Sequence, residues 1–371
     1  MKILCLSRAP LDYKGGIPAY CLSLYSNKKF KINNFSFDLS KSLKKVKKRT
    51  FNNIKENVYP SQIVIGTMAL SIEYLFSILK NSSKFDLIHL QHPDPFSSIC
   101  TILAKLINPK LKLLITWHAD IYGSYKLIAP ILFLLDIILY SLSSKIIFFT
   151  PQHLKNSIIN NIYFLRKKVK LIPFCFDIEN RDKVLKKKVP LSQKRVINIL
   201  SIGRLVSYKG YEYAIKAISK TNPRIKYRII GVGPLEKKLK KLIYSYNLED
   251  RVFLMGEVDE IMKKDLLSKA DIFLFPSISN SEAYGLVQLE AMANRLPIIN
   301  TFLNNGVNYL APETVAITCN IMDSKELYDS IIKLLNDNNF YYLESDASFN
   351  NLSRFNYKKM ISSFCKLLKE I

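Results

Sequence analysis

The stretch "DIFLFPSISNSEAYGLVQLEAMANRLPIINT", residues 271–301, sets two apolar runs on either side of a segment with helical spacing. The two ends of this stretch are short and rich in Ile, Leu and Phe, as in strands that are buried on both faces. Between them, Leu286, Leu289 and Ala293 recur at the interval that places side chains on one face of a helix. A strand, a crossover helix and a second strand predict a parallel sheet.

Short apolar runs and periodic segments alternate in this way along the whole chain. The other runs that are predicted as strands are 2–7, 85–92, 111–118, 144–150, 168–174, 196–203, 226–233, 251–256 and 315–318. Helical spacing is clearest over 210–220 and 235–248. Because the alternation occurs in two sets, we predict an α/β protein with two Rossmann-like, doubly wound domains.

At 371 residues the chain is too long for one ordinary core. The charged stretch 175–195 lacks apolar spacing and is predicted as a linker. We therefore predict a first domain over 1–176, a second over 177–355, and a helix over 356–371. The ligand of two facing domains is expected in the cleft between them, beyond the carboxyl ends of the strands.

Lysine and arginine outnumber aspartate and glutamate by 55 to 30, which gives a net charge of +25. Such a surplus indicates an anionic partner or a biased composition. The densest basic run consists of Lys41, Lys44, Lys45, Lys47, Lys48 and Arg49. Near an anionic bilayer each such side chain contributes about 1 kcal/mol to binding, although a solvated face is the ordinary role of such a run. Nucleic acid is the less favoured partner, because no known nucleic-acid motif accompanies the charge.

The apolar run Ile3–Leu6 is far too short for a signal peptide, so we expect a cytoplasmic protein, at most peripheral on the inner face of the membrane. Six scattered cysteines suggest neither a zinc site nor a disulfide framework. The most apolar segment, 127–142, is shorter than the roughly 20 residues that a membrane span requires. We predict a buried helix there, in preference to a membrane-facing one.

Two glycines, Gly15 and Gly16, follow the first predicted strand and precede a helix. Glycine lets a ligand approach the backbone, and a helix N-terminus offers N–H groups to an anion. Arg204 and Lys209 lie in the turn after another strand, where a guanidinium and an ammonium can hold a diphosphate. For the glycines a plain loop is at least as good an explanation. For Arg204 and Lys209 taken alone, two more cations in a basic protein are the more frequent explanation.

Two acids frame the helix in the opening stretch: Glu282 precedes it and Glu290 is expected in its second turn. The backbone N–H groups near Tyr284 to Leu286 suit a phosphate oxygen, because the aligned peptide dipoles place positive charge there. Glu282 can instead be an acid that interacts with that dipole, and Glu290 a solvated residue.

His118 ends an apolar strand, where it can donate to a substrate oxygen or exchange a proton near neutral pH. A structural role is the more frequent one for a lone histidine. The same two roles, with the structural one more frequent, apply to His89 and His92. No pair of acids with DxD spacing follows a strand. We therefore expect neither a metal nor another cofactor.

The order of these motifs resembles one family: GG at 15–16, "TWHAD" at 116–120, "GRLVSYKG" at 203–210, "GVGP" at 231–234, and two glutamates eight positions apart before "AMA". The chain is similar to retaining GT-B glycosyltransferases of family 4, over nearly its whole length and most densely from 201 to 301. The residues of these motifs most resemble those of bacterial mannosyl- and rhamnosyl-type enzymes that build O-antigens, lipopolysaccharides and other polysaccharides.

The resemblance implies roles for four charged residues. Arg204 and Lys209 match the pair that binds the donor diphosphate and stabilises the departing nucleotide. Glu290 matches the glutamate on the donor ribose, and Glu282 the one that contacts the donor sugar.

The resemblance also implies that the carboxyl-terminal helix crosses back onto the first domain. An ordinary surface helix of the second domain fits the same apolar spacing.

The backbone of Tyr284, Gly285 and Leu286 matches the segment around the distal phosphate. Gly16, preceded by Gly15, matches the glycine loop beside the phosphates and the acceptor.

His118 matches the histidine that contacts the donor sugar near the reacting carbon. Gly231 and Gly233 match a turn on the nucleotide side, and the chain near Glu257 and Val258 is expected to flank the base.

Transfer of a glycosyl group leaves a nucleoside diphosphate with growing negative charge. Without a metal, fixed cations and helix-end amides must stabilise that charge, and losing one such group costs on the order of a hundredfold in rate. The resemblance implies retention by a same-face mechanism, in which the leaving phosphate oxygen takes the acceptor's proton.

The chain departs from the family at two turns. Asn294 and Arg295 stand where relatives carry glycine after "EAMA", and we expect Asn294 to adopt the left-handed cap. Asn305-Gly306 stands where Gly-Gly is frequent, which puts the phosphate loop in question.

The function that these motifs predict is transfer of a hexose from a nucleotide sugar, with GDP-mannose favoured, to a glycan or lipid-linked saccharide. A sugar-nucleotide epimerase has the same architecture, and a binding-only relative would bind the donor without transfer or hydrolysis. Product analysis without an acceptor separates these alternatives.

Overall fold

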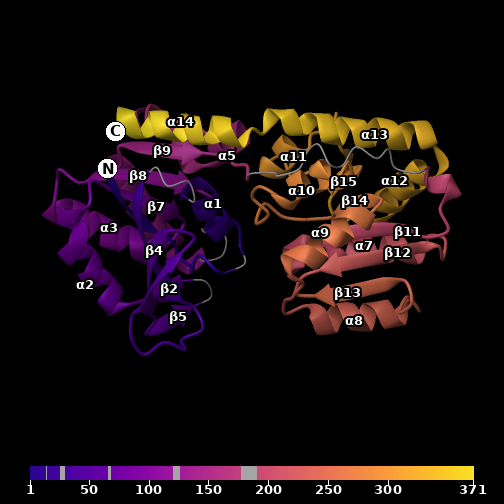
Figure 1. Ribbon diagram of the computed structural model, residues 1–371, viewed down its shortest axis with the longest axis horizontal. Coiled ribbons are helices and arrows are strands. Elements are labelled where there is room, and N and C mark those ends of the chain that lie inside the picture. Colours follow the sequence, from indigo (N-terminus) through magenta and orange to yellow (C-terminus); the bar gives the residue numbers. More distant parts are fainter. Residues whose placement is uncertain (14, 26–29, 66–67, 120–125, 177–189) are drawn as a thin grey trace. The chain divides into compact units, whose positions relative to one another are not determined.

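The computed structural model describes the chain except for residues 14, 26–29, 66–67, 120–125 and 177–189 (Figure 1). Most of the predicted linker at 175–195 lies outside the described residues. The chain forms two compact units. Unit 1 contains Met1–Asp177 and Tyr357–Ile371, and unit 2 contains Ile178–Asn356.

Unit 1 is built on an eight-stranded sheet with the order β10-β9-β8-β7-β1-β2-β4-β3. All neighbouring strands in it are parallel except β3 and β4. Its strands, with the small antiparallel pair β5 and β6, are β1 (Lys2–Leu6), β2 (Lys31–Asp38), β3 (Lys47–Phe51), β4 (Ile54–Pro60), β5 (Ile63–Ile65), β6 (Met68–Leu70), β7 (Leu87–His92), β8 (Lys112–Trp117), β9 (Lys145–Phe148) and β10 (Val169–Leu171).

Helices cover both faces of this sheet. They are α1 (Gly16–Tyr25), α2 (Ile72–Asn81), α3 (Pro95–Ile107), α4 (Ala129–Leu142), α5 (Pro151–Asn156), α6 (Tyr163–Arg166) and α14 (Tyr357–Glu370), with short 3₁₀ turns η1 (Ser82–Lys84), η3 (Lys126–Ile128) and η4 (Ile158–Asn161). One core cluster joins α2, α3 and α4 to side chains such as Leu90 and Ile115. The alternate residues of the same strands, including His89 and Thr116, face α1.

Helix α14 packs on unit 1 at the end of the chain (Figure 1). Its buried stripe consists of Met360, Ile361, Phe364, Leu367 and Leu368. The Tyr357 hydroxyl donates to the Ser23 carbonyl at 2.7 Å, and Lys170 pairs with Glu370 at 2.9 Å. The apolar spacing therefore packs this helix against unit 1.

Unit 2 is built on a six-stranded parallel sheet with the order β13-β12-β11-β14-β15-β16. Its strands are β11 (Ile197–Ile202), β12 (Ile225–Ile230), β13 (Val252–Gly256), β14 (Ile272–Phe275), β15 (Ile298–Thr301) and β16 (Ile317–Cys319). The strand order reverses between β11 and β14. In doubly wound sheets this switch point is where ligands bind, beyond the carboxyl ends of the strands.

The helices of unit 2 form a layer on each side of its sheet. They are α7 (Tyr211–Ser219), α8 (Glu236–Ser245), α9 (Glu260–Lys269), α10 (Val287–Ala293), α11 (Gly306–Leu310), α12 (Ser324–Asn336) and α13 (Asn338–Asn351), with 3₁₀ turns η6 (Leu191–Gln193), η7 (Ser207–Lys209) and η8 (Leu352–Arg354). The main core cluster packs α7, α8 and α12 on residues such as Ile199, Tyr227 and Leu274. This core fixes the strand ends from which the site residues project.

Every run that the sequence predicts as a strand forms one, whereas strands β2 to β6 were not predicted. The reason is visible in β2 and β4, where the buried side chains include Asn34, Ser36 and Glu56. Both Asn34 and Ser36 donate to the Glu56 carboxylate, at 2.9 and 3.2 Å. Satisfied polar groups replace the apolar residues by which a buried strand is usually recognised.

The prediction of a buried helix at 127–142 is only half right. Helix α4 buries Leu132, Asp136, Leu139 and Tyr140, but several of its apolar side chains are exposed to solvent. Among the described residues no helix is long and apolar enough to cross a membrane.

Candidate functional site

Two residues from opposite sides of the unit 2 switch point meet in an ion pair. Lys209 ends the turn after β11, and Glu282 lies in the loop after β14. The Lys209 ammonium pairs with the Glu282 carboxylate, and both side chains are nearly buried, with 11% and 12% exposed. The Ser277 hydroxyl also donates to Glu282, at 3.3 Å. The predicted diphosphate and sugar residues are thus direct neighbours.

The turn after β11 is shaped around the Lys209 side chain. A Cβ on Gly203 would lie 2.9 Å from both Cε and Nζ of Lys209, so glycine leaves the space that this side chain crosses. The ammonium lies 5.0 Å from the centre of the Phe275 ring, within the range of a cation–π contact. The Tyr208 carbonyl accepts from the Ile278 N–H at 2.8 Å, which ties this turn to the segment after β14.

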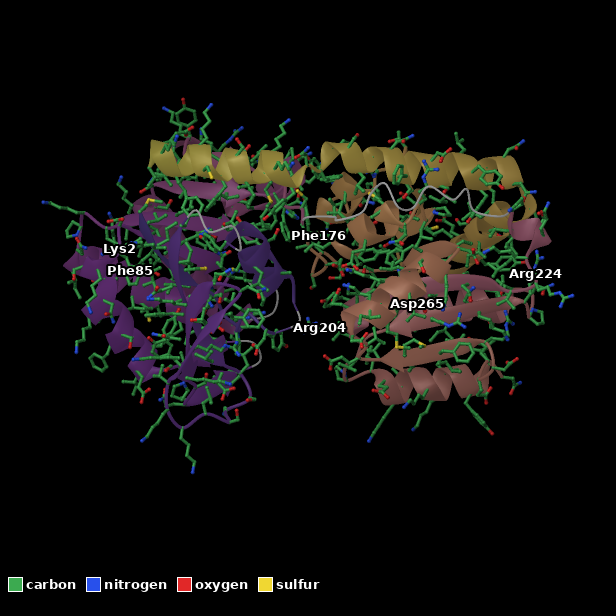
Figure 2. The ribbon with its side chains drawn as sticks, viewed as in Figure 1. Lys2, Phe85, Phe176, Arg204, Arg224 and Asp265 are labelled. Atoms are coloured by element: carbon green, nitrogen blue, oxygen red, sulfur yellow. The ribbon has the colours of Figure 1, made fainter. Side chains whose placement is uncertain are left out.

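Arg204 lies on the same turn and its side chain is exposed. Its guanidinium donates to the Tyr208 hydroxyl at 3.2 Å. Figure 2 shows Arg204 and Arg224 at opposite ends of the unit 2 sheet, because Arg204 follows β11 whereas Arg224 precedes β12. Arg204 is therefore an accessible cation at the carboxyl end of the strands, close in sequence to the buried Lys209.

Glu290 lies in the first turn of α10, whereas the sequence predicted the second turn. The helix begins only at Val287, because the chain before it forms a loop with Gly285 at a φ of 75°. The Glu290 carboxylate pairs with Lys263 of α9 at 3.1 Å, and Lys263 also pairs with Glu260 at 3.0 Å. Burial raises the pKa of the Glu290 carboxyl, and the Lys263 ammonium opposes that increase.

Sequence reasoning missed Lys263. It lies beside Lys264 in a helix with many charged residues, and nothing in that pattern distinguishes the two lysines. The second partly buried Lys–Glu pair of the site is consequently visible only in the structure.

The loop from Glu282 to Leu286 is held by a buried asparagine, Asn305. Its side-chain amide donates to the Glu282 carbonyl at 2.8 Å and to Asn280 Oδ1 at 3.1 Å. Its Oδ1 accepts from the Val307 N–H at 2.9 Å and so caps α11. The φ of Asn305 is −140°, a value that needs no glycine, so the departure at Asn305-Gly306 preserves the loop.

The turn after α10 corrects another expectation. Asn294 has a φ of −96° and uses its side-chain amide to donate to the Glu290 carbonyl at 2.8 Å. The left-handed residue is Arg295, with a φ of 52°. The N–H groups of Arg295 and Leu296 donate to carbonyls of the last turn of α10, at 3.0 and 3.1 Å, as in a Schellman cap. Arg295 in turn stacks over Phe349 of α13 at 4.3 Å.

The "GVGP" turn packs directly on the turn that carries Arg204. A Cβ on Gly231 would lie 2.0 Å from the Gly203 carbonyl oxygen, and one on Gly233 would lie 2.4 Å from the Leu205 carbonyl oxygen. Both glycines are required for the close approach of two backbone segments. The neighbouring Val258, with Glu257, follows β13 at the same end of the sheet.

Gly15 and Gly16 of unit 1 differ from these two glycines, because neither is required by its surroundings. Gly16 is the first residue of α1, and a Cβ there would meet no atom within 4 Å. A Cβ on Gly15 would make only ordinary contacts, the nearest at 3.6 Å. After β1, Glu56 Oε1 accepts from the Leu11 N–H at 2.9 Å. The open space at Gly16 leaves room for a ligand.

His118 follows β8 and is only partly exposed. Its Nε2 lies 2.9 Å from Gln91 Oε1, and since that oxygen only accepts, Nε2 carries the proton and Nδ1 is an acceptor. Burial lowers the pKa of His118 well below its usual value, with His89 and His92 adding to the effect. The expectation that His118 exchanges a proton near neutral pH is therefore not favoured by its surroundings.

His89 and His92 are structural residues of the unit 1 core. His89 contacts the Tyr25 hydroxyl through Nδ1, and its Nε2 lies 2.7 Å from the Thr116 hydroxyl. Burial lowers the pKa of His89 to about 3. His92 lies 2.9 Å from the buried Asp136 carboxylate.

The basic run 41–49 does not act as one exposed cluster. Arg49 donates to Asp12 through both terminal nitrogens, at 2.6 and 2.7 Å, and its Nε donates to Glu56 at 2.8 Å. It therefore stabilises the loop before Gly15. The five lysines of the run remain exposed, around the edge strand β3.

Within the part of the chain that the structure describes, no group of three or more His, Cys, Asp or Glu side chains is placed to hold a metal ion.

Comparison with known proteins finds a family that the second unit matches. Residues 182–354 match the family described as glycosyl transferases group 1. The chain is 36% identical over 118 residues to an Escherichia coli glycosyltransferase named for colanic acid biosynthesis, a stretch that covers 30% of this chain and 29% of that relative. It is 23% identical over 335 residues to the N-acetyl-alpha-D-glucosaminyl L-malate synthase of Bacillus anthracis, with 84% of each chain covered.

The fold is shared over a greater length than the sequence. The crystal structure of Anabaena HepE in complex with UDP-glucose superposes with a TM-score of 0.77, at 18% identity and with all of both chains covered. The chain therefore has the GT-B fold, with two Rossmann-like units.

Proposed function

Because residues 182–354 belong to the group 1 glycosyl transferases, we propose that this protein transfers a hexose from a nucleotide sugar to a glycan or a lipid-linked saccharide. The proposed setting is the biosynthesis of a cell-surface polysaccharide such as an O-antigen, and the Escherichia coli relative is itself named for the biosynthesis of a polysaccharide, colanic acid. The observation that carries the proposal is the Lys209–Glu282 pair at the switch point of unit 2, with Arg204 on the same turn.

The proposed role of Arg204 and Lys209 is to stabilise the departing diphosphate. Lys209 is nearly buried, and a cation in such a site interacts with a phosphate more strongly than one in water. Glu282 holds the ammonium in place before the donor binds. Glu282 then serves the donor sugar, while the backbone of Tyr284, Gly285 and Leu286 lies beside the distal phosphate.

Glu290 is the proposed partner of the donor ribose. Its ion pair with Lys263 favours the ionised carboxylate, which accepts hydrogen bonds from two ribose hydroxyls better than a protonated carboxyl does. The proposed base-flanking segment is Glu257 and Val258.

In unit 1, Gly16 is proposed to leave room for the phosphates and the acceptor. His118 is proposed to accept a hydrogen bond from a sugar hydroxyl through Nδ1, because its Nε2–H is directed to Gln91. This role requires a neutral imidazole.

The proposed reaction retains the configuration of the sugar and needs no metal ion. The bond from the anomeric carbon to the phosphate oxygen breaks, and a bond to the acceptor oxygen forms on the same face. The acceptor's proton passes to the leaving phosphate oxygen, and Arg204 and Lys209 stabilise the nucleoside diphosphate that departs.

The donor is tested first, by incubating the full chain with a panel of sugar nucleotides and measuring both thermal stabilisation and slow donor hydrolysis. GDP-mannose is the expected donor, and UDP-glucose is the second candidate because Anabaena HepE was crystallised with it. Hydrolysis should continue in the presence of EDTA. An epimerised donor without hydrolysis would assign the protein to the epimerases, and stabilisation without either reaction to binding-only relatives.

The site is tested by Arg204→Ala, Lys209→Ala and Glu290→Ala. Each is expected to lower donor hydrolysis by on the order of a hundredfold while the protein remains folded. Full activity in all three variants would reject the assignment.

A further inference from the structure

An exposed apolar surface covers the outer side of two helices of unit 1. Helices α3 and α4 pack side by side on the same face of the sheet. We define the α3–α4 surface by their exposed large apolar side chains: Ile99, Leu103, Leu106, Ile107, Ile131, Phe133, Leu134 and Ile138. Contiguous surfaces of this kind on a folded protein mark sites of interaction with another molecule or with a membrane.

The spacing shows that the exposed residues form stripes. Ile131, Leu134 and Ile138 recur at intervals of three and four, and Leu134 is 61% exposed. The opposite side of α4 is also apolar, with Leu139 and Tyr140 fully buried in the core. A surface helix that only covers a core carries polar residues on its outer face, so the outer stripe of α4 needs a different explanation.

The charge of this region is strongly one-sided. Residues 95–176 contain ten lysines and arginines but only two carboxylates, Asp120 and Asp136. Asp136 is buried against His92, and Asp120 lies outside the described residues. Wherever this part of the chain is described, its exposed charges are therefore all positive.

Cations lie at the carboxyl ends of both helices. The Lys168 ammonium donates to the carbonyls of Ser141 and Ser143 at the end of α4, at 2.6 and 2.8 Å. This contact brings the exposed Arg166 and Lys167 next to that end. Lys110 is exposed just after α3.

The carboxyl ends of α3 and α4 lie close together. The Ser144 N–H after α4 donates to the Leu113 carbonyl after α3 at 2.7 Å. The cations therefore border one end of the α3–α4 surface.

We infer that the α3–α4 surface docks on an anionic lipid bilayer. The apolar stripes would enter the boundary between head groups and acyl chains, while Lys110, Arg166 and Lys167 contact the lipid phosphates. With 14 residues α4 is too short to span a bilayer, which fits a helix that lies in the interface.

This surface is distinct from the lysines around β3. Strand β3 forms one edge of the unit 1 sheet, whereas α4 connects β8 and β9 near the other edge. Bilayer binding here is also independent of the proposed reaction, since it is measured without donor or acceptor.

A second copy of the chain fits this surface less well. In a two-fold dimer the same patch faces itself, and because the described residues of 95–176 expose cations but no carboxylates, the patch of the second copy would offer these cations no opposite charge. Anionic lipid head groups supply that neutralising charge.

The test uses the full chain and sedimentation with vesicles of phosphatidylcholine, with or without phosphatidylglycerol. The double variant Leu106→Ser/Leu134→Ser should lower binding to the anionic vesicles by about tenfold or more, because two large apolar side chains no longer enter the lipid. The control Ile261→Ser/Leu343→Ser replaces side chains of unit 2 that are 82% and 65% exposed, and it should bind like the wild type. Circular dichroism confirms that both variants are folded.

A second variant, Lys110→Gln/Lys167→Gln, should weaken binding only to the anionic vesicles, because neutral vesicles offer no net charge. Wild-type binding by Leu106→Ser/Leu134→Ser, or absence of wild-type binding to anionic vesicles, would overturn the inference. A dimer that this double variant dissociates, with vesicle binding unchanged, would assign the surface to a second copy. Donor hydrolysis by the variants, measured without vesicles, reports separately on the proposed function.

Discussion

The ammonium of Lys209 and the carboxylate of Glu282 form an ion pair that joins the segments after β11 and β14, the two strands between which the order of the unit 2 sheet reverses. Each side chain is nearly buried, so each compensates a charge that would otherwise be costly to bury. The pair therefore fixes the Lys209 ammonium at the carboxyl end of the strands.

A double-mutant cycle is expected to measure this pair directly. Lys209→Met and Glu282→Gln should each destabilise unit 2, and the double variant should lose less than the sum, with a coupling energy of about 1–2 kcal/mol. Urea unfolding at neutral pH gives the free energies. Strictly additive effects would mean that the two groups do not stabilise each other in solution.

The pair of Glu290 with Lys263 predicts a pH-dependent loss of donor affinity. Burial already raises the pKa of the Glu290 carboxyl, so removing the ammonium in Lys263→Met should raise it further. The carboxylate then takes up a proton at higher pH, and donor affinity should fall increasingly as the pH is lowered toward 5, by about tenfold or more. Isothermal titration calorimetry with the donor nucleotide at several pH values measures this loss.

Lys264→Met is the matched control for that experiment, because Lys264 is the neighbouring, exposed lysine on the same helix. It should leave both the affinity and its pH dependence unchanged. Equal losses in the two variants would show that overall charge, and not the contact with Glu290, determines the affinity.

Two glycine-to-alanine changes should separate function from folding. Gly16→Ala meets open space and should change the free energy of unfolding by no more than about 0.5 kcal/mol. Because its methyl group enters the proposed path of phosphates and acceptor, donor hydrolysis should fall by about tenfold or more.

Gly231→Ala should behave in the opposite way. Its Cβ would overlap the Gly203 carbonyl oxygen, so it should destabilise unit 2 by on the order of 3 kcal/mol. Thermal unfolding and donor hydrolysis are measured for both variants. Normal hydrolysis by Gly16→Ala would remove that glycine from the site.

The stability of unit 1 should decrease in weak acid because of His89. Burial lowers the pKa of its imidazole from 6.5 to about 3, so the unfolded chain binds the proton and the folded chain does not. The stability is complete above pH 6.5 and falls as the pH decreases toward 3, by about 2 kcal/mol at pH 5. His89→Gln should remove this part of the pH dependence in urea unfolding at pH 7.5 and 5. An unchanged difference between the two pH values would assign it to other groups.

The fold could be predicted wherever strands are buried in apolar surroundings. β14, with the sequence "IFLF", can be recognised as a strand from its composition alone. β2 and β4 could not be recognised, because Asn34 and Glu56 satisfy one another in the core and interrupt the apolar pattern. Such strands depend on partners that are distant in the sequence.

The site could be predicted in part, for a similar reason. Lys209 and Glu282 were proposed from motifs that lie next to strands, but their direct pairing depends on the order of strands in the sheet. Lys263 reaches Glu290 from helix α9, and Gln91 reaches His118 from the carboxyl end of β7. Neither position has a pattern in the sequence that distinguishes it from its neighbours.

Arg295 shows how one turn can tie distant positions of this chain together. A left-handed residue other than glycine costs energy, and here Phe349 and Asp346 of α13 hold the arginine that adopts it. Homologues with glycine at this position are released from that requirement. Among related sequences, the identities of residues 295, 346 and 349 are therefore expected to covary. A sequence search that requires glycine after "AMA" will miss proteins in which an arginine adopts the left-handed conformation of this turn.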